Sequence, residues 1–236
     1  MQVLRSLETN SHDALITDPP YSSGGLHVGA RQQAPCTKYI QSGGQTRHAE
    51  FTGDNRDQRS QTLWCTLWLL ECFRILREGS PVCLFTDWRQ LPMTTDALQA
   101  AGFTWRGIAV WDKTEGVRPQ KGRFRAQAEY IVWGSKGGLP MDRPAPILPG
   151  VFREPIRRND KFHMTGKPTD LMRQVVKICE PGGRILDPFA GSGTTLVAAG
   201  LEGYAWTGIE LTEYYHQVSG QRLQEIVAPF ELEGSQ

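Results

Sequence analysis

The chain has 236 residues, a length that fits one α/β domain with a sizeable core better than two full domains. Hydrophobic residues make up 39% and charged residues 22%, which is typical of a globular protein and excludes a disordered chain. The 26 basic and 25 acidic residues leave a net charge of +1, which argues against a strongly basic nucleic-acid binder.

The sequence also bears on location and on metal or disulfide chemistry. No apolar run approaches the ~20 residues that a membrane span needs, and the first residues lack a signal-peptide core. We therefore expect a cytoplasmic protein with no membrane partner. The five cysteines form no CxxC pair and the histidines show no ligand spacing, so we expect neither a disulfide framework nor a metal site.

The charge is unevenly distributed along the chain. Residues 106–125 and residues 153–177 each carry a net charge of +4, whereas residues 180–236 carry −6. Such a division predicts a basic face that the near-neutral total conceals, although ordinary solvated surface charge would give the same counts.

The first half of the chain begins with a short apolar run over residues 13–17, which predicts a buried strand stopped by Pro19 and Pro20. Residues 22–60 are rich in Gly, Ser, Gln and Thr without a sustained period, and predict a long functional loop. The elements expected next are a helix over 61–77, strands over 82–85, 103–111 and 129–133, and a helix over 92–101.

The second half opens with a Pro/Gly-rich, irregular stretch, and residues 134–161 are the best candidate for a small insertion. Pro168 then begins a helix whose apolar side predicts burial of Leu171, Met172, Val175, Val176 and Cys179. The remaining expected elements are strands over 184–186 and 204–209 and helices over 195–201 and 213–226. Because strands and helices alternate, we expect one doubly wound α/β domain over residues 1–236, with a mostly parallel sheet covered on both faces.

A glycine-rich turn joins one of these strands to the following helix. Gly191-Ser192-Gly193 would let the backbone approach a ligand, and the helix N-terminus would offer free N–H groups to an anion. The next strand ends in Glu210, whose carboxylate could bind both ribose hydroxyls. The loop lacks the third glycine of a dinucleotide fingerprint and the Gly-Lys-Ser/Thr of a P-loop. A ribose and an anion without a pyrophosphate favour S-adenosylmethionine, while a purely structural turn is the alternative.

The segment Asp18-Pro19-Pro20-Tyr21 lies where catalytic groups of a doubly wound sheet lie, at the carboxyl end of a strand. The Asp18 carboxylate and the Pro19 carbonyl could accept the two N–H groups of an exocyclic base amine and make its nitrogen nucleophilic toward a sulfonium methyl. Tyr21 offers a flat face for a base taken out of its stack. As an isolated tetrapeptide the same segment could be an ordinary turn.

Together these motifs resemble the DNA amino-methyltransferases that modify adenine N6 or cytosine N4. The catalytic motif precedes the cofactor loop, as in the permuted β group of that family. The resemblance implies a Rossmann-like S-adenosylmethionine-dependent methyltransferase fold, with residues 163–226 as the cofactor-binding half and 134–161 as a small target-recognition insertion. It is carried further by His163-Met164-Thr165-Gly166-Lys167-Pro168, which is similar to the family's H-x-T-x-K-P segment.

The resemblance implies roles for three sets of residues. The catalytic set is Asp18, Pro19, Pro20 and Tyr21. The cofactor-binding set is Thr165, Lys167, Pro168, Asp187, Phe189, Ala190, Gly191, Ser192, Gly193, Thr194 and Glu210. The segment from Trp111-Asp112-Lys113 through Arg123-Phe124-Arg125 to Glu129 is similar to one that lies beside the target base in the family.

The chain departs from the family at its start. The family has a strand ending in an acid, then a short helix, before the catalytic strand, and that acid contacts the cofactor adenine. Met1 falls inside the equivalent of that helix. We expect the edge strand to be absent, to be replaced by the tail over 227–232, or to precede a recorded start that is late.

DNA contacts are expected from the basic segment between two of the strands, which is irregular and suited to phosphate binding. The residues expected to bind DNA are Lys113, Arg118, Lys121, Arg123 and Arg125. Because the insertion is short, the target site is expected to be short and a homodimer reading a palindrome is plausible. Pro35-Cys36 is similar to a cytosine-C5 nucleophile, but an incidental loop cysteine explains it better. Asp87-Trp88-Arg89 fits a target pocket or a helix cap equally well.

The sequence therefore predicts an S-adenosylmethionine-dependent enzyme that methylates the N6 amine of a flipped adenine in double-stranded DNA and releases S-adenosylhomocysteine. Asp18 rather than Ser favours adenine N6 over cytosine N4. A cytosine-N4 enzyme, an RNA or protein amino-methyltransferase and a non-catalytic DNA-binding protein remain as alternatives.

Overall fold

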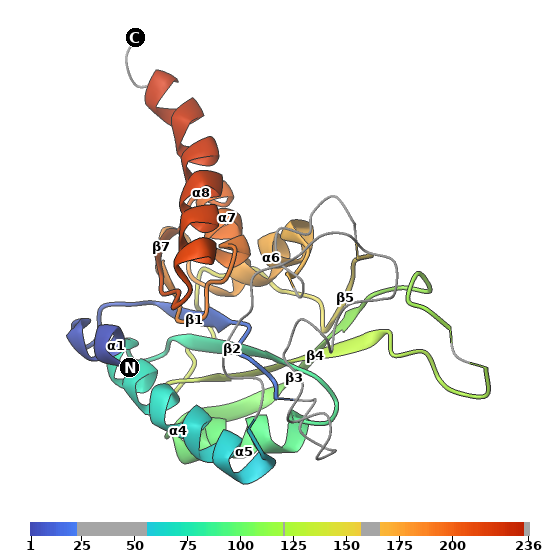
Figure 1. The fold of residues 1–236 in the computed structure, drawn as a ribbon. Helices are drawn as coiled ribbons and strands as arrows, with labels where there is room; N and C mark the ends of the chain where they lie inside the picture. Colours follow the sequence, from blue (N-terminus) through green and yellow to red (C-terminus); the bar gives the residue numbers. More distant parts are fainter. Residues whose placement is uncertain (23–55, 120, 157–165, 234–236) are drawn as a thin grey trace.

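The computed structural model describes residues 1–22, 56–119, 121–156 and 166–233 (Figure 1). For residues 227–233 it describes the backbone only. Most of the predicted loop over 22–60 and part of the predicted insertion over 134–161 therefore lie outside the described residues, as do Thr165 and Cys36. No helix within the described ranges is long and apolar enough to cross a bilayer.

The described strands form a single seven-stranded sheet in the order β5-β3-β4-β2-β1-β6-β7. Their bounds are β1 Ala14–Thr17, β2 Pro81–Thr86, β3 Thr104–Asp112, β4 Ala128–Ser135, β5 Val151–Arg153, β6 Arg184–Asp187 and β7 Ala205–Gly208. β1 pairs in parallel with β2 and β6, β6 with β7, and β3 with β5. β4 alone among these strands runs antiparallel to its neighbours, β2 and β3.

Helices cover both faces of this sheet (Figure 1). Their bounds are α1 Gln2–Ser6, α4 Gln58–Ile75, α5 Leu91–Ala100, α6 Thr169–Val175, η3 Val176–Ile178, α7 Thr194–Leu201 and α8 Glu213–Glu233. α1, α4 and α5 pack on one face, whereas α6 and α7 pack on the other, with α8 against α7. This arrangement confirms the expected doubly wound α/β architecture.

The two cores follow from the period of two along the central strands. On β1, Leu15 points to the α4–α5 side, whereas Ala14 and Ile16 point to the α6–α7 side. Because every residue of β1 and β2 is buried, these strands read as continuous apolar runs, as parallel strands covered on both faces do. The five residues that the sequence assigned to the apolar side of the helix after Pro168 are all nearly inaccessible.

Three features of the fold differ from the predictions or add to them. α8 continues as a helix through Glu233, so the alternative that the tail replaces the family's edge strand is wrong. β7 and β5 are the two edge strands of the described sheet. β5 was not predicted, because a three-residue strand in a Pro/Gly-rich stretch leaves no readable period.

The first described part of the predicted insertion lies far from the carboxyl ends of the parallel strands. Because β4 runs antiparallel, its last residue, Ser135, pairs with Pro81 at the amino end of β2. Pro140 then lies beside Gly79, and the Arg143 guanidinium donates to the Ile178 carbonyl and to Glu180. These residues buttress the amino edge of the sheet, while the recognition role of the segment stays a prediction.

Candidate active site

A cavity of about 540 Å³ opens at the carboxyl edge of β1, β6 and β7. In a doubly wound sheet this is the edge where ligands bind, and the volume suits a cofactor-sized molecule. Its wall brings together residues from both predicted motifs. They are Asp18, Pro19, Pro20 and Tyr21 from the first, and Asp187, Phe189, Ala190, Gly191, Ser192, Thr194 and Glu210 from the second. Lys167 also lines it.

The glycine loop turns sharply between β6 and α7. Gly191 and Gly193 both have positive φ, at 52° and 81°, and Gly193 is the N-cap of α7. A Cβ on Gly193 would lie 2.7 Å from the Ser219 Cβ of α8, so this glycine is needed for helix packing. The prediction that both glycines bring backbone close to a ligand therefore fits Gly191, which lines the cavity, better than Gly193, which packs on α8.

Glu210, which follows the end of β7 and Ile209, is tied to this loop. Its Oε2 accepts a hydrogen bond from the Gly191 N–H at 2.9 Å, and its Oε1 accepts one from the Thr212 N–H at 2.7 Å. Each carboxylate oxygen has a further lone pair that can face the cavity. The acid predicted to bind a ribose is thus held at the rim of the cavity by backbone donors.

Asp187 ends β6 beneath the same loop. It is 1% exposed, and its Oδ1 accepts hydrogen bonds from the Thr17 hydroxyl at 2.6 Å and from the Phe189 N–H at 3.1 Å. Burial raises the pKa of this carboxyl to about 6, against the opposing effect of its hydrogen bonds. A cationic group in the cavity would therefore stabilise the ionised form of Asp187.

An aromatic group closes one end of the cavity. The Phe189 ring lies 5.4 Å from that of Trp64 and 5.0 Å from that of Trp68, both on α4. The Arg56 guanidinium lies 4.4 Å from the Trp64 ring centroid. Both tryptophans and Arg56 line the cavity, so they offer flat faces for an aromatic ligand group.

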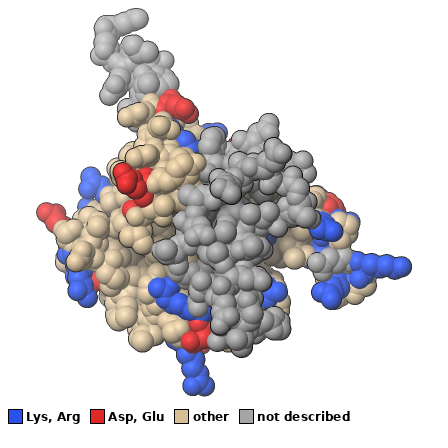
Figure 2. Space-filling model, viewed as in Figure 1, with Lys and Arg blue, Asp and Glu red and all other residues tan. Residues whose placement is uncertain are grey.

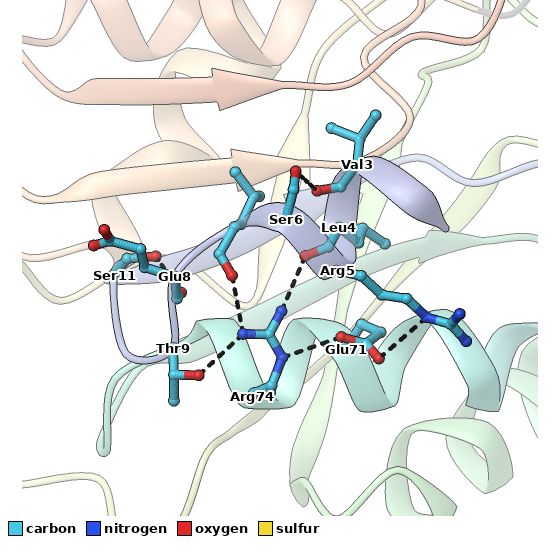
Figure 3. A network of polar contacts seen from close by, with 10 residues as sticks. Val3, Leu4, Arg5, Ser6, Glu8, Thr9, Ser11, Glu71 and Arg74 are labelled. Carbon is cyan, nitrogen blue, oxygen red and sulfur yellow. Dashed lines mark hydrogen bonds and ion pairs between the residues drawn. The ribbon is translucent and has the colours of Figure 1, made fainter.

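The N-terminal helix completes this end of the wall, because Met1, Gln2, Val3 and Leu4 line the cavity. The Arg74 guanidinium on α4 fixes the helix by donating to the Leu4 and Leu7 carbonyls and to the Thr9 hydroxyl, and it also contacts Glu71 (Figure 3). In this way α1 is anchored to the α4 side of the sheet.

Two further residues that sequence reasoning missed come from α8. Tyr215 is 1% exposed and lines the cavity. Arg222 is buried, and its Nη1 donates to the Ser192 carbonyl at 2.7 Å and to the Thr194 hydroxyl at 3.1 Å. The helix over 213–226 was predicted, but its sequence does not show that Arg222 is buried, and a buried cation needs acceptors such as these.

The loop after β1 is clamped from α4. Gln61, which is 1% exposed, donates from Nε2 to the Pro20 carbonyl at 2.7 Å and accepts from the Ser22 hydroxyl at 3.2 Å. Within the described residues the neighbouring Pro19 carbonyl accepts no hydrogen bond. The clamp thus engages one proline carbonyl and leaves the one predicted to face a substrate amine available.

Asp18 belongs to a compact group of two acids, two lysines and a tyrosine, which we call the acid–lysine cluster: Asp18, Tyr21, Glu129, Lys167 and Lys113. The Lys167 Nζ lies 2.5 Å from Asp18 Oδ2 and 2.9 Å from Glu129 Oε1. The Tyr21 hydroxyl lies 2.6 Å from Asp18 Oδ1 and 2.7 Å from Glu129 Oε1. The Lys113 Nζ contacts Glu129 Oε2 at 2.9 Å.

The cluster shifts the pKa of its members in opposite directions. Burial and the Glu129 charge raise the pKa of Asp18, although Lys167 counteracts them. The two lysines lower the pKa of Glu129 to about 2 despite its burial. The two carboxylates raise the pKa of Lys167 against the effect of burial, so its ammonium stays charged. Glu129 is therefore firmly ionised, and Asp18 is the more basic of the two acids.

Three predicted site residues make contacts that their predicted roles did not include. Lys167, predicted to help hold the cofactor, lines the cavity and also contacts Asp18 and Glu129. Lys113, predicted to bind DNA, is part of the same cluster and is only 18% exposed. Pro168 is the N-cap of α6 and is buried, so its described role is to begin that helix.

The other predicted DNA contacts lie together on the connection between β3 and β4, which projects from the sheet (Figure 1). Arg118, Lys121, Arg123 and Arg125 are all exposed there, and blue side chains mark this projection at the right of Figure 2. We call residues 113–127 the basic arm. The Arg125 guanidinium donates to the Glu115 and Val117 carbonyls and so braces the arm.

The second basic segment does not form such a face in its described part. Arg173 and Lys177 on α6 and η3 pair with Glu202, with N–O distances of 2.7 Å and 3.0 Å. Arg153 pairs with Asp112 and Glu115. Residues 157–165 of this segment lie outside the described residues. The described support for a basic DNA face thus comes from the arm.

The remaining sequence candidates have structural explanations. Asp87 accepts hydrogen bonds from the Arg89 and Gln90 N–H groups in the turn before α5, so it shapes that turn, while Gln90 is the N-cap of the helix. The four described cysteines are buried free thiols. No group of three or more side chains that could hold a metal occurs in the part of the chain that the structure describes. The expectation that no metal is needed stays a prediction.

Comparison with known proteins gives matches over nearly the whole chain. The family model N6_N4_Mtase, described as DNA methylase, matches residues 12–221. YubD of Escherichia coli (strain K12), which carries the name methylase, is 30% identical over 227 residues, covering 96% of this chain and 88% of YubD.

Solved structures share the fold. TTHA0409 of Thermus thermophilus, a DNA modification methylase by name and complexed with S-adenosyl-L-methionine, has a TM-score of 0.69 at 20% identity, covering 96% of this chain and 90% of that one. The PvuII DNA methyltransferase, whose name specifies cytosine N4, has a TM-score of 0.68 at 17% identity, covering 95% of this chain and 86% of that one. The fold is thus shared with an enzyme whose name specifies cytosine N4, and it does not by itself identify the target base of this chain.

Proposed function

This chain belongs to the N6_N4_Mtase family of DNA methylases, and from that premise we propose that it transfers the methyl group of S-adenosylmethionine to the N6 amine of an adenine flipped out of double-stranded DNA. One observation carries the proposal: Asp18 and the glycine loop, whose motifs lie about 170 positions apart in the sequence, line a single cavity. A methyl donor and an acceptor amine can meet there. The proposed DNA substrate and the bacterial origin of YubD support a location in the prokaryotic cytoplasm.

The residues around the cavity fit the cofactor. Asp187 would face the cationic amino group of the methionine moiety, and the free lone pairs of Glu210 would accept the ribose hydroxyls. Trp64 and Phe189 would pack against the adenine of the cofactor. In the family an acid at the end of an edge strand contacts this adenine, and the described residues contain no equivalent of that strand. When bound, S-adenosylmethionine supplies an electrophilic sulfonium methyl group.

Asp18 and Pro19 would prepare the amine that attacks this methyl group. The side chain of Asp18 is 24% exposed, so part of it reaches the cavity, which Pro19 also lines. Two acceptors on the two N–H groups pull the amine toward a pyramidal, nucleophilic nitrogen. As the N–C bond forms, the C–S bond breaks and its electron pair stays on sulfur. The methylated nitrogen then gives one proton to the Asp18 carboxylate.

The target base requires a platform, because a base inside the duplex cannot reach the cavity. The Tyr21 ring is held in place through its hydroxyl, which bonds to Asp18 and Glu129. A fixed ring loses little conformational freedom when a base stacks on it. Adenine is favoured over cytosine because position 18 holds Asp instead of the Ser that the resemblance associates with cytosine N4.

The basic arm is the proposed DNA contact. Its exposed arginines and lysine suit phosphates, and its two ends lie at members of the acid–lysine cluster, Lys113 and Glu129. Phe124, between Arg123 and Arg125, is fully exposed at 102%. An apolar ring flanked by two cations suits contact with a base step next to phosphates. DNA bound to the arm would present its target base beside Tyr21.

We further propose that the enzyme acts as a homodimer. Leu63, Leu67 and Leu70 are 62%, 48% and 46% exposed along one side of α4. Their spacing places them on a single face of the helix, which is the pattern of a covered apolar stripe. A second copy of the chain would cover this stripe and allow a palindrome to be read from both sides.

The proposed activity is tested by supplying labelled S-adenosylmethionine with DNA, RNA and protein in parallel. We expect label in double-stranded DNA only, recovered as N6-methyladenine after digestion. Label in RNA or protein alone would replace the proposed substrate, and DNA binding without methyl transfer would indicate a protein that has kept only the fold.

A further inference from the structure

Glu129 is a buried acid that the resemblance places near the target base but to which the proposed chemistry gives no task. It is 8% exposed and does not line the cavity, yet three cluster members contact it. Its Oε1 is shared by Tyr21 and Lys167, and its Oε2 is bound by Lys113. Burying a carboxylate costs free energy, which the two lysines and the tyrosine hydroxyl offset here, and such arrangements are concentrated at functional sites.

The position of Glu129 comes from the sheet. It is the second residue of β4 and pairs with Trp111 on β3, while Lys113 follows β3 directly. Because β4 is antiparallel to its neighbours, its amino end lies at the carboxyl ends of β2 and β3, which is the edge that holds the cavity. The antiparallel direction of β4 thus places Glu129 next to the site.

The geometry shows what Glu129 does to Asp18. One ammonium, that of Lys167, lies between the two carboxylates, at 2.5 Å from Asp18 and 2.9 Å from Glu129. If Lys167 faced Asp18 alone, its whole charge would act on Asp18 and make that carboxylate a weak proton acceptor. The Tyr21 hydroxyl has one proton to donate and lies between the same two acids.

We propose that Glu129 is a positioning residue for methyl transfer: it holds Tyr21 and Lys167 against Asp18 and takes a share of the lysine charge, so that Asp18 remains basic enough to accept the proton of the amine. This inference rests on the proposed function, because Asp18 is taken as the acceptor. Because Glu129 does not line the cavity, its effect would pass through Asp18.

The groups that face Asp18 and Glu129 fix the direction of the pH effect. Asp18 faces Lys167, Tyr21 and Glu129, and Glu129 faces both lysines and Tyr21. Asp187 is a further acid that interacts with Asp18. Since the Glu129 charge raises the pKa of Asp18, removing that charge lowers it, and the acidic limb of the pH–rate profile moves to lower pH.

The test compares Glu129→Gln with Glu202→Gln in single-turnover methyl transfer on DNA between pH 5 and 9. Glutamine keeps the size of the side chain and one acceptor oxygen but removes the charge. Glu202 is a matched control, because it also pairs with two cations but lies at the C-terminal end of α7 and does not line the cavity. We expect the Glu129 variant to lose at least about tenfold in the chemical step. Its acidic limb moves to lower pH, and its KM for DNA and cofactor changes little.

A second variant keeps the test decisive if Glu129→Gln folds poorly. Lys113→Met removes the cation that neutralises Glu129 from the outer side, so the acidic limb should move in the opposite direction, to higher pH. Opposite shifts are not expected from loss of packing. Limbs unchanged in both variants, or a loss that appears only in KM, would overturn the inference. If the unmodified enzyme transfers no methyl group to DNA, it is the proposed function that fails.

Discussion

The two ends of the cavity are held together by different forces. At the end formed by the glycine loop, where we propose that the cofactor binds, backbone groups make the structure: Gly191 donates to Glu210, Phe189 donates to Asp187, and Gly193 packs on α8. At the end formed by the acid–lysine cluster, where we propose that the target base binds, side-chain charges do so, since Lys167 contacts both Asp18 and Glu129. We call these the cofactor end and the target end. The cofactor end should therefore be sensitive to added atoms and the target end to altered charge.

The most severe break of the target end is Asp18→Ala. The change removes the proposed proton acceptor and leaves Lys167 facing Glu129 alone. We expect methyl transfer to fall by about a thousandfold or more, while S-adenosylmethionine still binds. Rapid-quench kinetics measures the first quantity and calorimetry the second. Full activity in this variant would refute the proposed chemistry.

The basic arm adjoins the target end, and we expect the DNA affinity that it provides to depend on salt concentration. Changing Arg123 and Arg125 together to Ala should weaken DNA binding by roughly ten- to a hundredfold at moderate salt, because the salt slope falls by about 0.9 for each phosphate that is no longer neutralised. Arg184→Ala, an exposed change at the amino edge of the sheet, is the control. The measurement is the DNA affinity of each variant across a salt series. If the slope of log affinity against log salt concentration stayed constant in the double variant, the DNA-binding face would have to lie elsewhere.

The cofactor end should lose stability when one methyl group is added to its backbone. Gly193→Ala strains a backbone with φ of 81° and places a Cβ 2.7 Å from Ser219. We expect a loss of about 2–3 kcal/mol in the free energy of unfolding, measured with urea. Gly203→Ala is the matched control, since its φ is 79° but its Cβ would meet open space. Equal losses at the two positions would show that the contact with α8 has no part.

The smallest expected effect is a pH dependence of cofactor binding that arises from Asp187, a buried acid at the cofactor end. Its pKa of about 6 is above the ordinary value of 3.8, so the free enzyme takes up a proton there as the pH falls through 6. Binding of the cationic amino group requires the ionised form, so cofactor affinity should fall by about tenfold for each pH unit below 6. Calorimetry in two buffers should detect proton release on binding near pH 6. Asp187→Asn should remove this pH dependence.

The sequence predicted the elements of the fold better than the interactions within the site. Pro19 and Pro20, the glycine turn and the apolar stripe after Pro168 are local signals, and the structure has the strand ends and helix starts where these signals placed them. The direction of β4 was not predictable, because the alternation of strand residues does not specify which neighbour a strand pairs with.

The acid–lysine cluster could not be predicted from local sequence patterns either, because its members are far apart in the sequence. Tyr21 and Glu129 are 108 positions apart, and Asp18 and Lys167 are 149 apart. Their contacts exist because the sheet brings the ends of β1 and β4 to one edge. The available signals were the resemblance, which places the segment ending at Glu129 beside the target base, and the charge of Glu129 at the start of an otherwise apolar strand. Neither signal named its partners. The same holds for Arg222, whose acceptors lie 28 and 30 positions away in the glycine loop.

The most direct test of the central claim is to express the chain in cells free of other DNA methylation and to identify the modified base by digestion and mass spectrometry, with modification-sensitive sequencing to locate it. The proposed function predicts N6-methyladenine at one short recurring sequence, present with the unmodified chain and absent with Asp18→Ala. N4-methylcytosine in its place, or DNA that carries no new modified base, would contradict it.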